Sequence, residues 1–507
     1  MIYHSTFSLD LRTIYYLITF ASYFHSVCEA ASVTGPNKLN VPRVLLVSFD
    51  GFRWDYLSRS ETKDHTPNFH RIMNDGIYAK RGIKNAFITK TFPNHYTIVT
   101  GLYEESHGIV ANVMYDPVFN ETFNIYNVKQ ERSPKWFDNG GEPIWVTNQL
   151  QDDCNCRKTG VVFWPGDSAS VKGVLPYRYL LYDKTMKNKT RVDTMVKWFT
   201  DKYPVNLGLL YFEEPDSYGH EFGPDSPQMN EMIIGLDGVV GYLLDELKAK
   251  GILDSTDIII TSDHGMASTP NTTVINLDEH ISVNDYRIFA SNPIGNILPN
   301  PGKEEEIYNK LQNIPHLTVY RKEDIPDEFH YKHNRRIQPL LLVTDEGYSL
   351  THNKSTIEKG NHGYNNSFPD MHPFFIAMGP SFKKGYTIDT FDNVDIYPLM
   401  CEILGIKPAP NNGSLKNVQS LLKVKPKSTG FFNYDSTFLI YIIILLFIAT
   451  VGGIFSIAAC RQQRIHHHRK LRLSSLSPMT MHLKYTSPPT NGGRKPLLNG
   501  SDTEEEF

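Results

Sequence analysis

Acidic and histidine side chains follow three apolar runs of this sequence, at the points where the runs end. They are Asp50 after residues 44–49, Glu213, Glu214, Asp216 and His220 after residues 207–212, and Asp263 and His264 after residues 257–262. A single aspartate in such a place is most often a turn residue. Several carboxylate and imidazole donors at one sheet edge instead suit catalytic Zn²⁺, and two ions need about six protein ligands. The spacing therefore favours a zinc site with enough ligands for two ions.

Buried strands are the elements that would position these side chains. Five apolar runs recur, at residues 44–49, 207–212, 257–262, 339–344 and 373–379. Their apolar character is continuous rather than alternating, which is typical of strands covered on both faces in a parallel sheet. Helix-like stretches lie between them, such as Gln228 to Lys250, which Gly251 ends. The alternation predicts a doubly wound, mostly parallel α/β fold, in which ligands bind beyond the carboxyl ends of the strands.

Two apolar segments near the chain ends predict a membrane topology. Residues 1–30 contain a basic residue, a short apolar stretch and small residues around Ala30, which is typical of a secretory signal peptide; an uncleaved anchor is the alternative. Residues 438–459 carry no charge and are long enough for a transmembrane helix. Arginines from Arg461 to Arg472 follow, and positive charge on that side places it in the cytoplasm. We therefore expect a single-pass type I protein of the plasma membrane.

The other segments follow from this topology. Residues 40–424 show no internal repeat and are expected to form one extracellular domain, joined to the membrane by a linker at residues 425–437. Residues 460–507 are basic, then rich in Ser, Pro and Gly, then acidic, a composition expected of a disordered cytoplasmic tail. Six Asn-x-Ser/Thr sites support a glycosylated ectodomain. They are Asn120, Asn188, Asn271, Asn353, Asn365 and Asn412.

Three cysteines fall in the expected ectodomain, which is few for an extracellular protein. Cys154 and Cys156 are separated by one residue and could close only a very small and strained ring. Cys401 lies in an apolar run and is expected to be a buried thiol. The odd number means that at least one of the three is free or pairs between chains.

The overall charge excludes a strong general affinity for nucleic acid. The chain has 51 Lys and Arg against 55 Asp and Glu, a formal net charge of -4. No global positive field favours nucleic acid, and no obligate protein partner is indicated. A polyanionic substrate remains compatible with this charge, because bound metal ions would supply the positive charge that matters.

Five sequence blocks resemble the ectonucleotide pyrophosphatase/phosphodiesterases of the alkaline phosphatase superfamily. They are Leu45–Leu57, Thr89–Asn112, Glu213–Ser226, Ile260–Met266 and Gly360–Asn366, in the order in which that family has them. Residues 143–151 and 333–348 look most like its short, membrane-anchored fourth and fifth members. The resemblance implies an alkaline-phosphatase-like fold and a nucleotide pyrophosphatase/phosphodiesterase, a phosphoric diester hydrolase, at the cell surface.

The resemblance also implies a site, carried over position by position. One zinc ion would be bound by Asp50, Thr91, Asp263 and His264, and the other by Asp216, His220 and His362. Thr91 would be the nucleophile of a double displacement through a threonine-bound nucleotidyl intermediate, with zinc favouring its alkoxide. The residues after Thr91 suggest a helix start, where backbone N–H groups favour a phosphoryl group. Asn112 matches the family's phosphate-binding asparagine.

Substrate choice depends on two aromatic side chains. Phe92 and Tyr182 match those that sandwich a nucleobase in nucleotide-cleaving relatives, and Tyr179 competes with Tyr182 for this role. Stacking is worth about 1–3 kcal/mol per base and tolerates different bases. The expected substrates are extracellular nucleotides such as ATP and dinucleoside polyphosphates, with nucleoside 5′-monophosphate as product. Two alternatives stay open: a lysophospholipid phosphodiesterase of the same fold, and a catalytically silent surface receptor or adhesion protein.

Overall fold

The computed structural model describes residues 41–290, 292–352, 357–424 and 436–473. The predictions of a signal peptide at residues 1–30 and of glycosylation at Asn353 therefore lie outside the described residues. The chain divides into two compact units, Met1–Val424 and Lys425–Phe507. Each unit is described by itself.

An eight-stranded sheet forms the centre of the larger unit. Its order is β18-β2-β17-β8-β1-β7-β5-β6. The bounds are Arg43–Phe49 (β1), Ile77–Ala79 (β2), Thr159–Val162 (β5), Arg178–Leu180 (β6), Leu207–Phe212 (β7), Thr256–Thr261 (β8), Phe375–Met378 (β17) and Tyr386–Ile388 (β18). Neighbours run parallel except where β17 pairs antiparallel with β8 and β2. Three predicted runs are thus the adjacent central strands β8, β1 and β7, as expected of a doubly wound fold.

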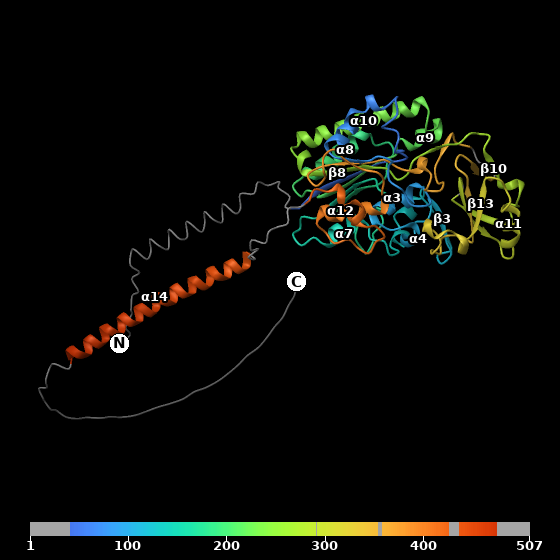
Figure 1. Cartoon of the computed structure of the whole chain (residues 1–507). Coiled ribbons are helices and arrows are strands. Elements are labelled where there is room, and N and C mark those ends of the chain that lie inside the picture. The colour runs from blue at the N-terminus through green and yellow to red at the C-terminus, as the bar shows by residue number, and fades with distance from the viewer. Residues whose placement is uncertain (1–40, 291, 353–356, 425–435, 474–507) are drawn as a thin grey trace, which may run out of the picture. The chain divides into compact units, whose positions relative to one another are not determined.

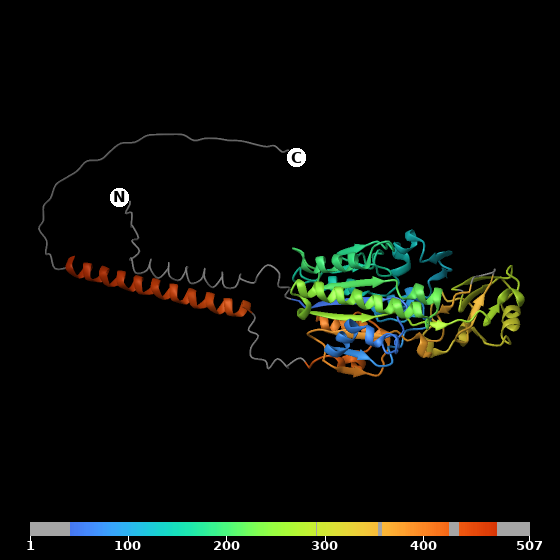
Figure 2. The ribbon, with the colours of Figure 1, turned by 90° about the horizontal axis from the view of Figure 1, so that it is seen from above.

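Helices cover both faces of this sheet (Figure 1, Figure 2). One face carries α2 (Pro67–Asp75), α8 (Asn188–Thr200) and α10 (Pro227–Ala249), and the other carries α3 (Thr91–Thr100), α7 (Ile144–Leu150) and α12 (Ile396–Leu404). The predicted helix from Gln228 to Lys250 is α10. It begins where the Ser226 hydroxyl accepts the Met229 N–H at 3.2 Å, because a side-chain acceptor there satisfies an otherwise unpaired N–H. A separate apolar core fills each side of the sheet.

A four-stranded antiparallel sheet forms a smaller lobe beside the main sheet (Figure 1). Its order is β11 (Tyr286–Phe289), β12 (Ile294–Pro299), β14 (Leu340–Thr344) and β13 (Leu317–Arg321), with α11 (Glu304–Leu311) packed near β13. The run at residues 339–344 is β14, so its assignment to the parallel sheet is wrong. Leu340 and Leu342 pack into the lobe's own core, whereas Leu341 and Val343 pack into the core of the main sheet. Burial on both faces, and not parallel pairing, explains its continuous apolar pattern.

Shorter elements connect these layers. They are α4 (Glu104–His107), β3 (Val113–Asp116), β4 (Glu121–Asn124), α5 (Val128–Glu131), α6 (Pro134–Phe137), α9 (Asp216–Phe222), β9 (Ala267–Ser268), β10 (Val274–Asn276), β15 (Ser349–Thr351), β16 (Gly360–Asn361) and α13 (Leu415–Val418). Among them, α9 and β16 lie beside each other and carry site residues.

The described part of the smaller unit is one helix, α14 (Ser436–Leu473). Its segment Ile443–Arg464 is long and apolar enough to cross a membrane, with a mean hydropathy of 2.5. The predicted span at residues 438–459 lies within this helix. The helix continues beyond residue 459 to Leu473, so the first part of the predicted tail is helical rather than irregular.

The described part of the larger unit contains three cysteines and five glycosylation candidates. Cys401 is a buried free thiol, as predicted. Cys154 and Cys156 form a disulfide, so the small ring that their spacing allows is closed. Among the glycosylation candidates that the structure describes, three asparagines are exposed and two are partly exposed. They are Asn120, Asn271 and Asn412, and Asn188 and Asn365, respectively.

Candidate active site

Asp50, Asp263 and His264 meet at the carboxyl ends of β1 and β8. The two strands pair in parallel, with Ser48 opposite Thr261, so the residues that follow them reach the same level. The Nε2 atom of His264 lies 3.3 Å from Asp50 Oδ1 and 3.0 Å from Asp263 Oδ2. All three side chains are buried. They form the first ligand cluster, in which one ligand atom of each lies within 4.8 Å of the others.

Asp216, His220 and His362 form the second ligand cluster. Asp216 and His220 lie one turn apart on α9, with His220 Nε2 3.4 Å from Asp216 Oδ2, and His362 follows β16 with its Nε2 3.6 Å from Asp216 Oδ1. The rings of His264 and His362 stack with their centres 3.4 Å apart, so the two clusters adjoin. Glu213, the first acid after β7, does not join them, because it pairs with buried Arg191.

The donor atoms of both clusters fit metal ions. The Nδ1 atoms of the three histidines lie 2.8 to 3.0 Å from backbone carbonyl oxygens, namely those of Gly265 for His264, Gly360 for His220 and Thr89 for His362. An Nδ1–H donated in this way leaves the Nε2 lone pair of a neutral ring facing the cluster. One oxygen each of Asp50, Asp216 and Asp263 is buried without a hydrogen-bond donor among the described residues. Lone pairs and carboxylate oxygens at this spacing repel one another unless cations lie between them.

Electrostatics support the same assignment. Burial and then the charges of Asp263 and Asp216 raise the pKa of Asp50 to about 7. The pKa values of Asp216 and Asp263 are lowered instead, because burial is outweighed by the neighbouring His220 for Asp216 and by His264 and His95 for Asp263. Bound divalent cations would remove the penalty on Asp50 and hold all three carboxylates ionised.

Thr91 and Asn112 lie beside the first cluster. Thr91 is the first residue of α3, as the sequence suggests, and its Oγ1 lies 3.4 Å from His264 Nε2. The Phe92 backbone N–H donates to Asn112 Oδ1 at 2.9 Å. This bond turns the Asn112 amide so that its NH₂ group is the end left to donate, and both Thr91 and Asn112 line the same cavity. A hydroxyl, an amide donor and a helix N-terminus are suited to hold a phosphoryl group.

Two supporting side chains, His95 and Tyr211, were missed by the sequence analysis. His95 is buried, and its Nδ1 lies 2.9 Å from the Thr91 carbonyl oxygen and 3.4 Å from Asp263 Oδ2. The Tyr211 hydroxyl donates to Asp50 Oδ2 at 2.7 Å. His95 lies four residues after Thr91, and Tyr211 is paired with Ser48 across β1 and β7. Helical spacing from Thr91 is the one pattern that could have indicated His95.

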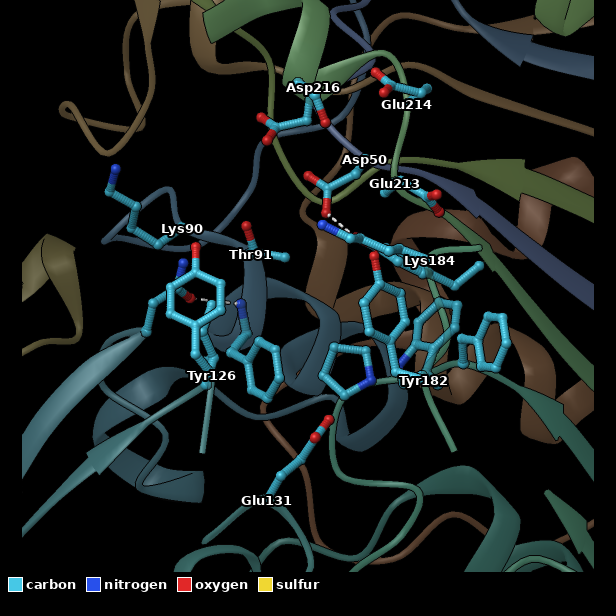
Figure 3. A pocket seen from close by; sticks show the side chains of 18 of the residues that line it. Asp50, Lys90, Thr91, Tyr126, Glu131, Tyr182, Lys184, Glu213, Glu214 and Asp216 are labelled. Carbon is cyan, nitrogen blue, oxygen red and sulfur yellow. Dashed lines mark hydrogen bonds between the residues drawn. The ribbon is translucent and has the colours of Figure 1, made fainter. Parts of the chain in front are cut away.

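A cavity of about 1270 Å³ lies over both clusters and is lined by Thr91, Asn112, Phe92 and Tyr182. Tyr182 is half exposed, and Figure 3 shows it on the opposite side of Thr91 from Tyr126 and Lys90. Tyr179, the alternative to Tyr182, packs against the core instead of lining the cavity. Burial lowers the pKa of Lys90 to about 8, and Glu358 and Asp216 oppose this shift.

The structure brings every predicted metal, nucleophile and substrate residue to this one cavity or its floor. Those lining it are Asp50, Thr91, Phe92, Asn112, Tyr182, Asp216, His220 and His362, and Asp263 and His264 lie beneath it in the first cluster. Their roles stay predictions. These residues come from seven separate stretches of the chain, so chance alone would not bring all of them to one cavity.

Known proteins share this fold and sequence. Residues 44–365 match the family model for type I phosphodiesterase/nucleotide pyrophosphatase. The chain is 45% identical to human ectonucleotide pyrophosphatase/phosphodiesterase family member 5 over 382 residues, 75% of this chain and 78% of that protein. It is 46% identical to mouse bis(5′-adenosyl)-triphosphatase enpp4 over 386 residues, 76% of this chain and 82% of that protein.

A solved structure supports the same relationship. An inactive variant of murine ectonucleotide pyrophosphatase/phosphodiesterase 5 in complex with AMP superposes with a TM-score of 0.72 at 43% identity, over 75% of this chain and all of that one. The predicted alkaline-phosphatase-like fold is confirmed. The chain belongs to the type I phosphodiesterase/nucleotide pyrophosphatase family, a family of enzymes that hydrolyse phosphodiester bonds.

Proposed function

We propose that this protein is a di-zinc hydrolase of the cell surface that cleaves extracellular nucleotides and releases nucleoside 5′-monophosphate. The observation that carries the proposal is the position of Thr91, at the start of α3, beside the first ligand cluster and in one cavity with Phe92 and Tyr182. Nucleotide phosphodiester hydrolysis requires a nucleophile, a hydrogen-bond donor to the phosphate and a pair of rings that stack on the base, all in one cavity.

The chain's own residues divide the chemical work. When bound, the two zinc ions would stabilise charge on the attacking and leaving oxygens. Thr91 Oγ1 attacks phosphorus and the bond to the leaving group breaks, which gives a nucleotidyl-threonine; water then releases the nucleoside monophosphate and restores Thr91. The NH₂ group of Asn112, whose Oδ1 is held by the Phe92 N–H, donates to a non-bridging oxygen. His95 fixes the Thr91 backbone, and Phe92 and Tyr182 hold the base.

Several observations favour nucleotides over the alternatives. Tyr182 lines the cavity together with Phe92, and a planar base between two rings gains stacking energy that a lysophospholipid does not. Two of the similar proteins are named for bis(5′-adenosyl)-triphosphatase activity or were solved with AMP. A silent receptor would not need the two ligand clusters and Thr91 together.

The cell-surface part of the proposal is supported by separate features. The segment Ile443–Arg464 is suited to a single membrane anchor, and arginines at its C-terminal end favour a cytoplasmic position for that end. The five described glycosylation candidates are exposed or partly exposed, as an extracellular position requires.

Product analysis with the full-length protein tests the proposed function. We expect bis(5′-adenosyl) triphosphate to give AMP and ADP, and ATP to give AMP and pyrophosphate. Lysophosphatidylcholine should be cleaved at least about 100-fold more slowly, because it has no base to stack on Phe92 and Tyr182. Chromatography of the products measures this. Faster cleavage of lysophosphatidylcholine than of either nucleotide would favour the lipid alternative. No cleavage of any of them by protein that contains zinc would favour the silent receptor.

Replacement of His95 by leucine tests how Thr91 is positioned. We expect kcat for ATP to fall about 10- to 100-fold with little change in KM. His95 contacts Asp263 and the Thr91 carbonyl oxygen, so its loss should disturb the reacting atoms more than the contacts with the base. Steady-state kinetics and zinc content are the measurements. Exposed His65→Leu is the matched control and should leave kcat unchanged. A folded His95→Leu protein with normal kcat would contradict this role.

A further inference from the structure

The cavity reaches beyond Phe92 and Tyr182 to a wall that the proposed mechanism does not use. Glu131, Arg132, Trp164, Asp167 and Ser168 line it there. Figure 3 shows Glu131 at the end of the cavity opposite Asp50 and Asp216, with its carboxyl group directed into the space between Tyr126 and Tyr182. A base stacked beside Tyr182, with its phosphate at Thr91, would direct an edge toward this wall.

The backbone below Glu131 is held in place. Glu131 ends the short helix α5, whose preceding Asn127 accepts the Lys129 N–H at 3.2 Å. Gln130 fixes the helix to β4, since its Oε1 accepts the Asn124 N–H at 2.9 Å and its Nε2 donates to the Thr122 carbonyl oxygen at 2.6 Å. Glu131 therefore extends from an anchored position rather than from a free loop, as a residue that reads a ligand edge should.

The carboxyl group of Glu131 is available as an acceptor. It is partly buried, and within the described ranges it has no hydrogen-bond donor; exposed Arg132 is the cation that acts on it. Burial raises the pKa of Glu131, and Arg132 lowers it. Both oxygens are thus free to accept from a ligand, and an unpaired, partly desolvated carboxylate gains most from such a bond.

Asp167 is a second acid on this wall, beside Glu131. Asp167 is 4% exposed, and its Oδ2 accepts the Trp164 N–H at 3.2 Å. Burial raises the pKa of Asp167 well above its usual value, and the charge of Glu131 adds to this shift, so the two acids are neighbours. The Trp164 indole N–H is already donated to the His95 carbonyl oxygen at 3.1 Å. The side chains of Ser168 and exposed Arg132 can still donate, and Glu131 is the carboxylate on this wall without a donor within the described ranges.

We propose that Glu131 determines base specificity: its carboxylate accepts a hydrogen bond from the exocyclic amino group of a base stacked between Phe92 and Tyr182. The inference rests on the proposed function and names the nucleotides that it favours. Bases with an amino group at this edge, adenine or cytosine, pair with the carboxylate. Bases with a keto oxygen there, hypoxanthine or uracil, place an acceptor against an acceptor, and that mismatch is what a polar site rejects most strongly.

The test compares ATP with ITP on the full-length protein and on Glu131→Gln. These two substrates differ at one edge of the purine: adenine has a 6-amino group and an unprotonated N1, and hypoxanthine has a 6-keto oxygen and an N1–H. We expect the wild type to prefer ATP in kcat/KM by about 10-fold or more, and Glu131→Gln to lower this ratio by about 10-fold or more, because the glutamine amide can donate to a keto oxygen. The matched control is Glu121→Gln, which removes the same charge. Glu121 is an exposed residue of β4 that pairs with Lys135, so the ATP to ITP ratio of this variant should equal that of the wild type.

A base-free substrate separates the possible outcomes. Bis(p-nitrophenyl) phosphate should be hydrolysed equally by the wild type and Glu131→Gln, because it has no base edge. An unchanged ATP to ITP ratio in Glu131→Gln overturns the inference, and so does an equal loss on all three substrates, which would indicate a structural role. A wild type that cleaves bis(p-nitrophenyl) phosphate but neither nucleotide overturns the proposed nucleotide function and this inference with it.

Discussion

Replacement of Thr91 by alanine is expected to lower kcat for ATP and bis(5′-adenosyl) triphosphate by about a thousandfold or more, the scale of loss when an enzyme's nucleophile is removed. No other described hydroxyl occupies the start of α3 beside the first ligand cluster. The neighbouring His264 and Asp50 cannot replace it, because their ring nitrogen and carboxylate oxygens face the cluster. Release of AMP over time measures the loss.

The same variant should still bind product. Asn112, Phe92 and Tyr182 remain in the cavity, so the affinity for AMP, measured by calorimetry, should change by less than about threefold, since removal of one uncharged hydroxyl group leaves the stacking contacts intact. Thr91→Ser provides the control, because it keeps an oxygen at the same position and should retain measurable turnover. If Thr91→Ala keeps half of the wild-type kcat, Thr91 is not the nucleophile.

The strands that carry the site could be predicted because their burial has a simple sequence pattern. Val44–Phe49 and Leu207–Phe212 are apolar at nearly every position, and acids that follow them come together because parallel strands finish at one edge. The run at residues 339–344 shows the limit of the same pattern. Its two faces are buried by two different cores, and a continuous apolar run does not tell which sheet a strand joins.

The outer part of the site was harder to predict than its ligands. Asp216 and His220 could be predicted from their one-turn spacing after a strand, whereas His362 and Thr91 were predicted from the family resemblance alone. Glu131 carries no local pattern: a glutamate in a polar stretch reads as a surface residue, and only the packing of α5 on β4 through Gln130 brings it to the cavity. Tertiary contacts, and not residue type or spacing, decide such positions.

Removal of metal is expected to abolish activity and to lower the thermal stability of the protein. Asp50, Asp216 and Asp263 each keep a buried oxygen without a donor among the described residues, and the pKa of Asp50 is raised to about 7 by burial first. Without cations the fold holds repelling charges or must take up protons, either of which weakens it. We expect chelation to lower kcat by about 100-fold or more, and added Zn²⁺ to restore it, because Lewis-acid stabilisation is worth several kcal/mol.

Stability should respond to zinc by mass action. Free Zn²⁺ at about a thousand times its Kd stabilises the folded state by about 4 kcal/mol per site, so the Tm of chelated protein should rise by several degrees on titration. Calorimetry measures this shift. A Tm that is the same with and without Zn²⁺, in protein shown to have lost its metal, would mean that the carboxylates are satisfied in another way.

Single substitutions should separate the two ions, because the clusters use different residues. Asp263→Asn weakens the first cluster and His362→Gln the second, and each should lower the zinc content from about two ions per chain toward one, the number that three or four remaining ligands can hold. Exposed Asp254→Asn should keep both ions. Loss of both ions from either variant would show that the clusters bind cooperatively, which the stacked His264 and His362 rings make physically reasonable. Retention of both ions in Asp263→Asn would exclude Asp263 as an essential ligand, and the first ion would then have to be held by Asp50 and His264 without it.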